Sequence, residues 1–177
     1  MSRLSKRAKR RQRGKMRAKV GIARMNKALG EFLTESGRVE FKMLLLVDRI
    51  SDAGLEHLFD EHSKESFGNK IKWFKKWCDF SGVSDKKKPL FQKVYWKIDD
   101  LLPKRNFLVH GETWEGAFKG QPMQPYRVGV IKDNLEYLDE FDRGKHGENV
   151  FSLQQVKDVS AECRDICANL DALMKPG

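Results

Sequence analysis

The sequence contains few cysteines and no long apolar run, and each shortage excludes a class of protein. Cys78, Cys163 and Cys167 are the three cysteines among 177 residues, and their spacing fits neither a zinc site nor a secreted disulfide framework. We therefore expect buried core thiols in a reducing cytoplasm. The longest apolar run, residues 43–47, has five residues, whereas a membrane span needs about 18 or more. We expect no contact with a membrane.

Two catalytic signatures are also absent from the sequence. It has no glycine-rich loop of the kind that binds nucleotide phosphates, and no nucleophile elbow of the hydrolases. The N-terminus lacks the apolar region of a secretory signal. The function must therefore be inferred from the basic residues and the helical segments of the chain.

Acidic residues are missing from positions 1–27, which hold 12 of the 35 lysines and arginines. The rest of the chain carries 23 basic and 25 acidic residues, so the net charge of +10 comes from this stretch. Residues 1–25 cannot bury a core, and we expect a basic tail that is disordered or transiently helical. Residues 26–177 have the length of one domain with a core.

We expect this tail to bind nucleic acid through phosphate contacts, without sequence preference and more weakly as the salt concentration rises. A solvated tail, a nuclear-type address and a mitochondrial transit peptide are alternatives with a similar composition. The candidate RNA-binding residues are Arg7, Lys9, Arg10, Arg11, Arg13, Lys15 and Arg17.

Apolar residues recur every three or four positions along four stretches, a pattern typical of helices that bury one face. It predicts helices over residues 29–50, 66–81, 89–102 and 152–174. Four helices with apolar seams predict an all-α bundle. The first seam consists of Leu29, Phe32, Ser36, Val39, Met43, Leu46 and Ile50.

Two of these helices have marked boundaries. Ser152 and Gln155 form a capping-box signature at the start of the last helix. Pro103 should kink or restart the third helix just before Arg105. Residues 51–66 are expected to form a connector with one turn.

The segment 112–151 is too long for a bare connection in a small domain. Residues 126–132 and 149–152 have β character and are expected to pair, with a short helix over 135–141 between them. Because the segment follows the third helix directly, we interpret it as a lid or a substrate-selecting insertion. Trp114 would anchor it against the bundle.

Two groups of side chains could be functional, but a purely structural role is favoured for each. His57 and His62 stand among acidic residues, yet their spacing matches no common metal site, and we expect a solvated surface. Trp73, Trp77 and Phe80 could stack on nucleic-acid bases. We expect them instead to pack in the core beneath a basic outer face formed by Lys70, Lys72, Lys75 and Lys76.

The stretch 101–114 combines a packed segment with three strongly polar side chains. On a helix, Asn106 and His110 are four residues apart and share a face, and the long side chain of Arg105 can curl toward it. Gly111 stands where helices commonly end. A fixed cation, an amide and an imidazole at one helix end are suited to handling a phosphate group.

Arg-Asn-x-x-x-His followed by glycine, late in a helical chain, resembles the Arg-x4-6-His motif of the HEPN superfamily. The resemblance covers residues 26–174. It implies a four-helix HEPN-like bundle, in which the segment 112–151, with its expected short β-hairpin, would be a long insertion between the third and last helices. Many members are metal-independent ribonucleases of toxin, antiphage-defence and RNA-processing systems, whereas others are inactive modules that bind RNA or a protein partner.

The resemblance also implies roles for the motif residues. His110 would act as general base or acid, Arg105 would stabilise charge on the phosphate, and Asn106 would orient His110 or the phosphate. It implies no metal and no cofactor. The implied partners are RNA, a second copy of the chain in a symmetric dimer, and a cognate inhibitor protein if the chain is a toxin.

Other interpretations of the motif stay open. Arg105 could pair with Asp99 or Asp100, Asn106 could bond to backbone, and His110 could lie as a satisfied side chain beside the helix end. The chain would then be a catalytically silent module with the same fold. A third alternative is a structural or regulatory helical protein, such as an antitoxin-like partner whose basic arm contacts acidic protein.

Overall fold

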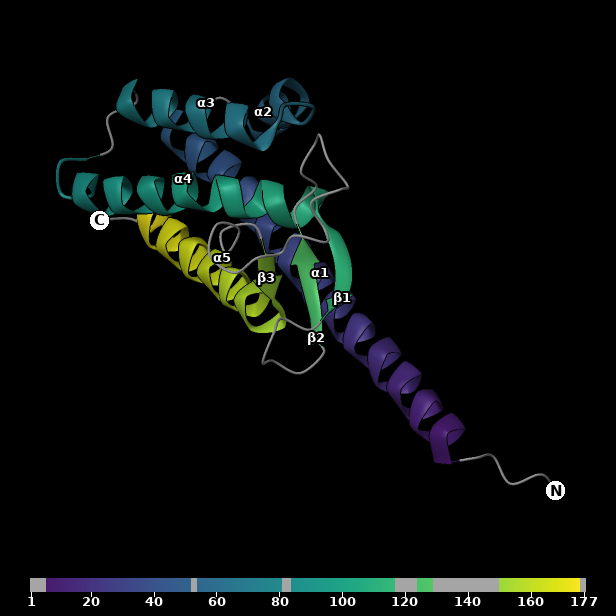
Figure 1. Ribbon diagram of the computed structural model, residues 1–177. Coiled ribbons are helices and arrows are strands. Elements are labelled where there is room, and N and C mark those ends of the chain that lie inside the picture. Colours follow the sequence, from purple (N-terminus) through teal and green to yellow (C-terminus); the bar gives the residue numbers. More distant parts are fainter. Residues whose placement is uncertain (1–5, 52–53, 81–83, 117–123, 129–149, 176–177) are drawn as a thin grey trace. The chain divides into compact units, whose positions relative to one another are not determined.

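The computed structural model describes residues 6–51, 54–80, 84–116, 124–128 and 150–175 (Figure 1). These residues form five helices and three short strands, so the described chain is mainly helical, as the apolar periodicity predicts. In chain order the elements are α1 Lys6–Ser51, α2 Leu55–His62, α3 Phe67–Phe80, α4 Lys88–His110, β1 Glu112–Gly116, β2 Gln124–Val128, β3 Val150–Ser152 and α5 Leu153–Met174.

The chain divides into two compact units, and helices α1, α4 and α5 each contribute to both. The first unit consists of Met1–Glu31 and Asn106–Lys157 and includes the three strands. The second consists of Phe32–Arg105 and Asp158–Gly177 and includes α2 and α3. The boundary between the units falls inside the predicted motif, directly after Arg105.

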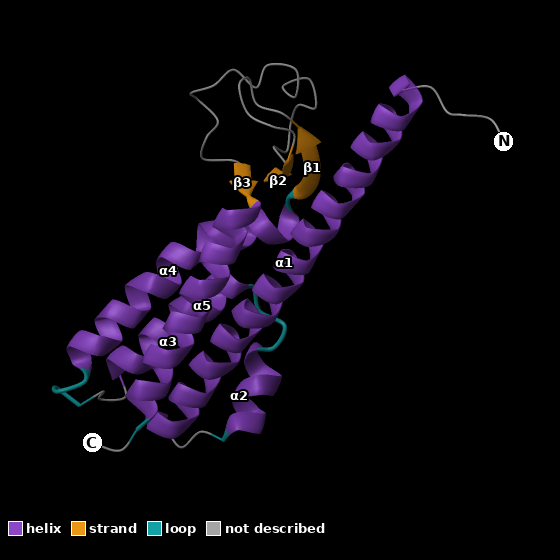
Figure 2. Ribbon diagram, turned by 90° about the horizontal axis from the view of Figure 1, so that it is seen from below, coloured by secondary structure: helices purple, strands orange, loops and turns teal. Residues whose placement is uncertain are grey.

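In the second unit, the latter part of α1 lies beside α3, α4 and α5 in a helical bundle (Figures 1 and 2). The seam predicted on the first helix is buried here, since Phe32, Val39 and Met43 are at most 1% exposed. Burying an apolar side chain of this size contributes about 1.5–3 kcal/mol relative to leaving it exposed. The other helices supply Phe67, Ile71, Phe74, Phe91, Val94, Ile98, Leu101, Val159, Cys163, Ile166, Leu170 and Leu173 to the buried set.

Helix α1 is longer than the sequence predicted, because it begins at Lys6 rather than near Leu29. Residues 6–25, expected to be a disordered or transiently helical tail, form its first turns. They contain no proline, and the Lys, Arg, Ala, Gln and Met residues that dominate them have high helix propensity. Among the side chains that the structure describes, which start at Val20, Met25 is the first buried one. The division into a basic tail and a domain near this residue stays a prediction.

Helix α2 replaces much of the connector expected over 51–66. It follows Gly54, whose φ of 87° is a conformation that favours glycine. The helix continues to His62, beyond the single turn that was expected. Leu58 and His62 are four residues apart, and both are buried.

Helix α3 agrees with the prediction over 66–81, but α4 differs from its prediction at Pro103. Helix α4 continues through this proline to His110, so the helix does not restart before Arg105, whereas a kink at Pro103 stays a prediction. The ring removes the backbone bond to the carbonyl of Asp99. Pro103 lies on the exposed side of the helix, where water can take the place of that bond.

The first unit contains an antiparallel sheet with the strand order β1-β2-β3 (Figure 2). Strand β2 pairs with β3, and Val128 lies opposite Val150. This confirms, over the described residues, the pairing expected between 126–132 and 149–152. Strand β1, which pairs with β2 along its whole length, was not predicted, because three of its five residues, Glu112, Glu115 and Gly116, are of types depleted in strands. The helix expected over 135–141 lies outside the described residues.

The start of α5 confirms the capping box. The N–H of Ser152 donates to Oε1 of Gln155 at 2.8 Å, and the N–H of Gln155 donates to Oγ of Ser152 at 3.2 Å. Just before it, the ring of Phe151 packs on Phe107 of α4 with centroids 5.0 Å apart. The side chain of Trp114 lies outside what the structure describes, so its anchoring role and the lid role of the insertion stay predictions.

Candidate functional site

The Arg-Asn-x-x-x-His motif occupies the last turns of α4. His110 is the last helical residue, and the N–H of Gly111 donates to the carbonyl of Phe107 at 2.8 Å, so the helix ends at the glycine as predicted. Arg105 is half-buried and belongs to the second unit, whereas Asn106 and His110 are exposed and belong to the first. One continuous helix carries all three side chains.

Arg105 binds a carboxylate, but neither of the two that its sequence neighbours suggested. Its Nη2 donates to Oε1 of Glu40 on α1 at 3.0 Å, and it makes no ion pair with Asp99 or Asp100. Its guanidinium carbon lies 5.0 Å from the ring centroid of Phe67 on α3, within the range of a cation–π contact. Its Nε is buried without a hydrogen-bond partner among the described residues. Two other helices therefore hold this cation in place.

Glu40 binds two cations at once. Its Oε2 accepts a hydrogen bond from Nζ of Lys70 on α3 at 2.8 Å, while Oε1 accepts from Arg105. The side chains of Arg105, Glu40 and Lys70 are 23%, 18% and 12% exposed, so water screens this Lys70–Glu40–Arg105 triad less than a surface pair. Two positive charges and one negative charge leave the triad with a net charge of one positive unit.

Sequence reasoning missed the other two members of this triad. Glu40 is 65 residues away from Arg105, and Lys70 was assigned to the outer basic face of its helix. Both lie beside buried seam positions, Val39 and Ile71. A charged residue next to an apolar seam indicates that its side chain can form a partly buried ion pair. The sequence does not indicate which helix supplies the partner.

Asn106 and His110 present their side chains to solvent. Neither side chain makes a hydrogen bond or ion pair within the described part of the chain, and no hydrogen bond joins the two. The expected role of Asn106 in orienting His110 therefore stays a prediction. An exposed imidazole at the end of a helix is accessible to a large substrate, which a buried one would not be.

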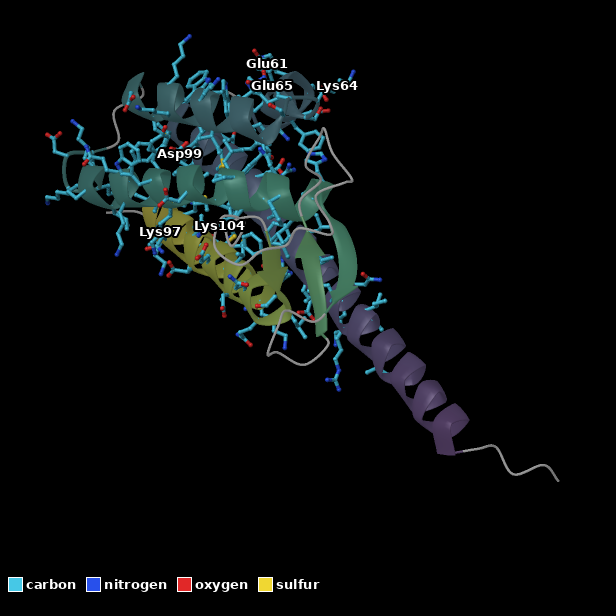
Figure 3. The ribbon with its side chains drawn as sticks, in the orientation of Figure 1. Glu61, Lys64, Glu65, Lys97, Asp99 and Lys104 are labelled. Carbon is cyan, nitrogen blue, oxygen red and sulfur yellow. The ribbon has the colours of Figure 1, made fainter. Side chains whose placement is uncertain are left out.

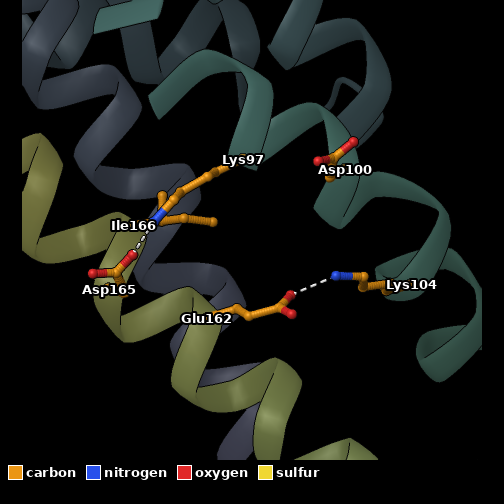
Figure 4. Close-up of a pocket in the computed structure, with 6 residues that line it drawn as sticks. All are labelled: Lys97, Asp100, Lys104, Glu162, Asp165 and Ile166. Carbon is orange, nitrogen blue, oxygen red and sulfur yellow. Dashed lines mark hydrogen bonds and ion pairs between the residues drawn. The ribbon is translucent and has the colours of Figure 1, made fainter. Parts of the chain in front are cut away.

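A shallow pocket lies between α4 and α5 in the second unit (Figure 4). Lys104 donates to Glu162 at 2.7 Å, and Lys97 donates to Asp165. The hydrogen bond from Lys97 lowers the pKa of Asp165. Because both cations of the pocket are already paired, it offers no free charge to an anionic ligand. The lining residues are Lys97, Asp100, Lys104, Glu162, Asp165 and Ile166.

The two histidines of α2 lie in different environments, and the expected solvated surface is correct for His57 alone. The side chain of His57 is 72% exposed, but that of His62 is 5% exposed and packs on Trp73. A carboxylate oxygen of Glu61 lies 3.7 Å from Nε2 of this buried ring, and one of Glu65 lies 3.3 Å from its Nδ1. Figure 3 labels both glutamates. Among the described residues no group of three His, Cys, Asp or Glu side chains could hold a metal ion.

The three cysteines are buried, as predicted for core thiols. Burial raises the pKa of Cys78 to about 12, and it raises the pKa of Cys163 to about 12 as well. The pKa of Cys167 is also raised, chiefly by burial. These thiols are therefore protonated near neutral pH, and a protonated thiol is a poor nucleophile.

Helix α3 packs its apolar stripe in the core, which supports core packing for Trp73 and Trp77, whereas the side chain of Phe80 lies outside what the structure describes. Trp73 and Trp77 are half-buried and contact each other edge to face, with centroids 6.3 Å apart. Lys72, Lys75 and Lys76 are exposed, as a basic outer face requires. The most exposed aromatic side chain in the described residues is instead Trp96 of α4, at 60%.

The seven candidate RNA-binding residues lie between Arg7 and Arg17 in the first turns of α1. Their side chains lie outside what the structure describes. The structure adds that their backbone is helical rather than extended.

No described helix is long and apolar enough to cross a membrane. No protein-family model, curated protein or solved structure matches the chain, so the HEPN resemblance depends on the motif residues and on their place at the end of α4.

Proposed function

We propose that the chain is a metal-independent endoribonuclease of HEPN type, built on a four-helix HEPN-like bundle with an insertion over 112–151. One observation carries the proposal. The last turns of α4 present Asn106 and His110 to solvent and carry Arg105, whose guanidinium is held in a defined position by Glu40. An imidazole can transfer protons and a guanidinium can stabilise negative charge in metal-free phosphodiester chemistry.

The proposed reaction is attack of a ribose 2′-hydroxyl on the adjacent phosphate. His110 takes the 2′-hydroxyl proton as general base, or gives a proton to the departing 5′-oxygen as general acid, since imidazole exchanges protons near neutral pH. The products are a 2′,3′-cyclic phosphate and a 5′-hydroxyl, and no water is consumed in this step. Arg105 stabilises the negative charge that builds up on the phosphorane oxygens.

One arginine and one histidine per chain are few catalytic groups for this reaction. We therefore propose a symmetric homodimer in which two motifs act together. The basic start of α1 would bind RNA through phosphate contacts. A toxin or antiphage-defence role in the cytoplasm, with a cognate inhibitor protein, fits such an activity.

A second candidate is a catalytically silent HEPN-like module that binds RNA or a protein partner. The ion pair between Arg105 and Glu40 favours it, because a structural cation is paired in the same way. RNA affinity that falls with salt and persists in His110→Ala, without cleavage by the parent protein, would support this candidate. Failure to bind RNA at low salt would point instead to a structural or regulatory protein.

The deciding experiment is incubation with total RNA in EDTA, using the parent protein and the variants Arg105→Ala and His110→Ala. Matched controls are Arg164→Ala and His57→Ala, which remove exposed residues of the same types elsewhere in the fold. Cleavage that ends in a cyclic phosphate, is lost in both motif variants and persists in both controls supports the ribonuclease. Equal cleavage by all five proteins overturns it.

A further inference from the structure

The Lys70–Glu40–Arg105 triad contains the cation that the proposed reaction needs, together with two charged residues that the reaction itself does not use. We propose that Glu40 and Lys70 are positioning residues for Arg105. Glu40 fixes the guanidinium, and Lys70 offsets the charge of Glu40 so that Arg105 keeps its electrostatic effect on a phosphate of RNA. This inference rests on the proposed ribonuclease function.

Three helices converge on Arg105 within the second unit. Glu40 reaches it from α1 at 3.0 Å, and the ring of Phe67 on α3 lies 5.0 Å from its guanidinium carbon. Lys70 is three residues after Phe67, so one face of α3 supplies both the ring and the second cation. A free arginine side chain loses about 2 kcal/mol of rotamer entropy when it is fixed. Here that cost is met during folding, before any substrate binds.

The charge of Glu40 would work against catalysis if it stood alone. A carboxylate at hydrogen-bond distance from a guanidinium cancels most of the guanidinium's electrostatic attraction for a second anion, such as a phosphate of RNA. Lys70 binds the other oxygen of the same carboxylate at 2.8 Å. The carboxylate is thereby shared between two cations, and the net positive charge survives. Because Lys70 is largely shielded from water, salt screens this effect little.

The guanidinium also keeps hydrogen bonds to offer. An arginine has five N–H donors. Glu40 accepts from Nη2 alone, and the Nε–H is buried, so the donors left for a phosphate are those of the two Nη atoms. The other described contact of the guanidinium, with Phe67, is a ring contact. An anchored cation with unused donors suits a phosphate better than a cation whose donors are all satisfied.

The experiment measures kcat and KM for cleavage of a defined RNA in EDTA by the parent, Lys70→Met and Lys70→Arg. The control is Lys42→Met, since Lys42 is another partly exposed lysine of this unit and pairs with Asp171. We expect Lys70→Met to lower kcat roughly tenfold or more with little change in KM, because the lost effect acts on charge that develops in the transition state. Lys70→Arg should restore most of kcat, and Lys42→Met should resemble the parent.

Thermal unfolding of each variant separates an effect on catalysis from loss of the fold. If Lys70→Met unfolds at the assay temperature, Lys70→Gln keeps a polar partner for Glu40 without the charge and should show the same loss of kcat. Equal kcat for the Lys70 and Lys42 variants overturns the inference while leaving the ribonuclease intact. Faster cleavage by Glu40→Gln also overturns it, because Glu40 would then compete with the phosphate. Absence of cleavage by the parent overturns the proposed function, and the inference with it.

Discussion

His62 lies against Trp73 with ring centroids 3.9 Å apart, and this contact joins α2 to α3. Its Nδ1 is 3.3 Å from a carboxylate oxygen of Glu65, and its Nε2 is 3.7 Å from one of Glu61. The other buried residue of this short helix is Leu58. Because two side chains supply the buried surface of α2, each should have a large effect on how firmly the helix is held.

We predict that His62→Ala destabilises the fold by roughly 2–3 kcal/mol, because it leaves a cavity beside Trp73. The matched control is His57→Ala on the same helix, which should change the free energy of unfolding by less than about 0.5 kcal/mol. Urea unfolding followed by tryptophan fluorescence measures both. Equal values for the two variants would show that α2 does not depend on the His62–Trp73 contact.

The raised pKa values of the cysteines predict a loss of stability in alkali. In the unfolded chain Cys78 and Cys163 ionise above their ordinary pKa of 9.0, whereas in the folded protein they stay protonated up to about pH 12. The unfolded state thus releases protons first, and stability falls as pH rises through this window, by about 1.4 kcal/mol per pH unit for each thiol. Lysines also titrate there, so the measurement is the difference in slope between the parent and Cys78→Val. Identical slopes would mean that the thiol ionises equally easily in both states.

The capping box of α5 predicts a coupled effect on stability. Ser152→Ala or Gln155→Ala should each cost about 1 kcal/mol, because each removes one of two reciprocal hydrogen bonds at the helix start. The double variant should cost less than the sum of the two, since both bonds belong to one motif. Lys157→Ala, an exposed residue of the same helix, serves as control. Additive losses would argue against a reciprocal cap.

The helices were predictable because burial of one face is a local property of the sequence. The buried residues Phe32, Val39 and Met43 recur at helical spacing, and the cap at Ser152 and Gln155 is read from two positions three apart. Hydrogen bonds between residues close in sequence can be predicted from the residue types at those positions. The pairing of β2 with β3 followed from β propensity for the same reason.

The partners of Arg105 were not predictable, because they depend on how helices pack. Periodicity identifies which face of α1 is buried, but not that Glu40 at its edge meets an arginine 65 residues away. The burial of His62 was missed for a related reason, since a polar segment was expected to stay in solvent. Strand β1 was missed because pairing, rather than its own composition, makes it a strand.

The two polar residues of the motif with proposed catalytic roles should differ in their effect on stability. Arg105→Ala should cost roughly 1–3 kcal/mol, because Glu40 loses one of its two partners in a half-buried position and Phe67 loses its cation. His110→Ala should change stability by less than about 0.5 kcal/mol, since its side chain is exposed. Urea unfolding of both variants tests this. A neutral Arg105→Ala would mean that the ion pair with Glu40 contributes nothing to the fold.

The basic start of α1 predicts a specific dependence of RNA binding on salt. Each phosphate contact with single-stranded RNA contributes about 0.7 to the slope of log affinity against log salt concentration. Replacing the seven candidate residues Arg7, Lys9, Arg10, Arg11, Arg13, Lys15 and Arg17 by glutamine should therefore reduce this slope by several units and weaken binding most at low salt. Fluorescence anisotropy with a labelled RNA, repeated over a salt series, gives the slopes.

A second variant determines whether the effect belongs to α1 or to positive charge in general. Lys72, Lys75 and Lys76 are exposed on α3, and replacing them by glutamine removes charge while leaving α1 intact. We expect a much smaller change in slope from this variant, because these lysines lie on a packed helix that also carries Asp79. A change as large per residue as that from α1 would show that RNA is attracted by the whole basic surface, and that the first turns of α1 do not form a distinct binding arm.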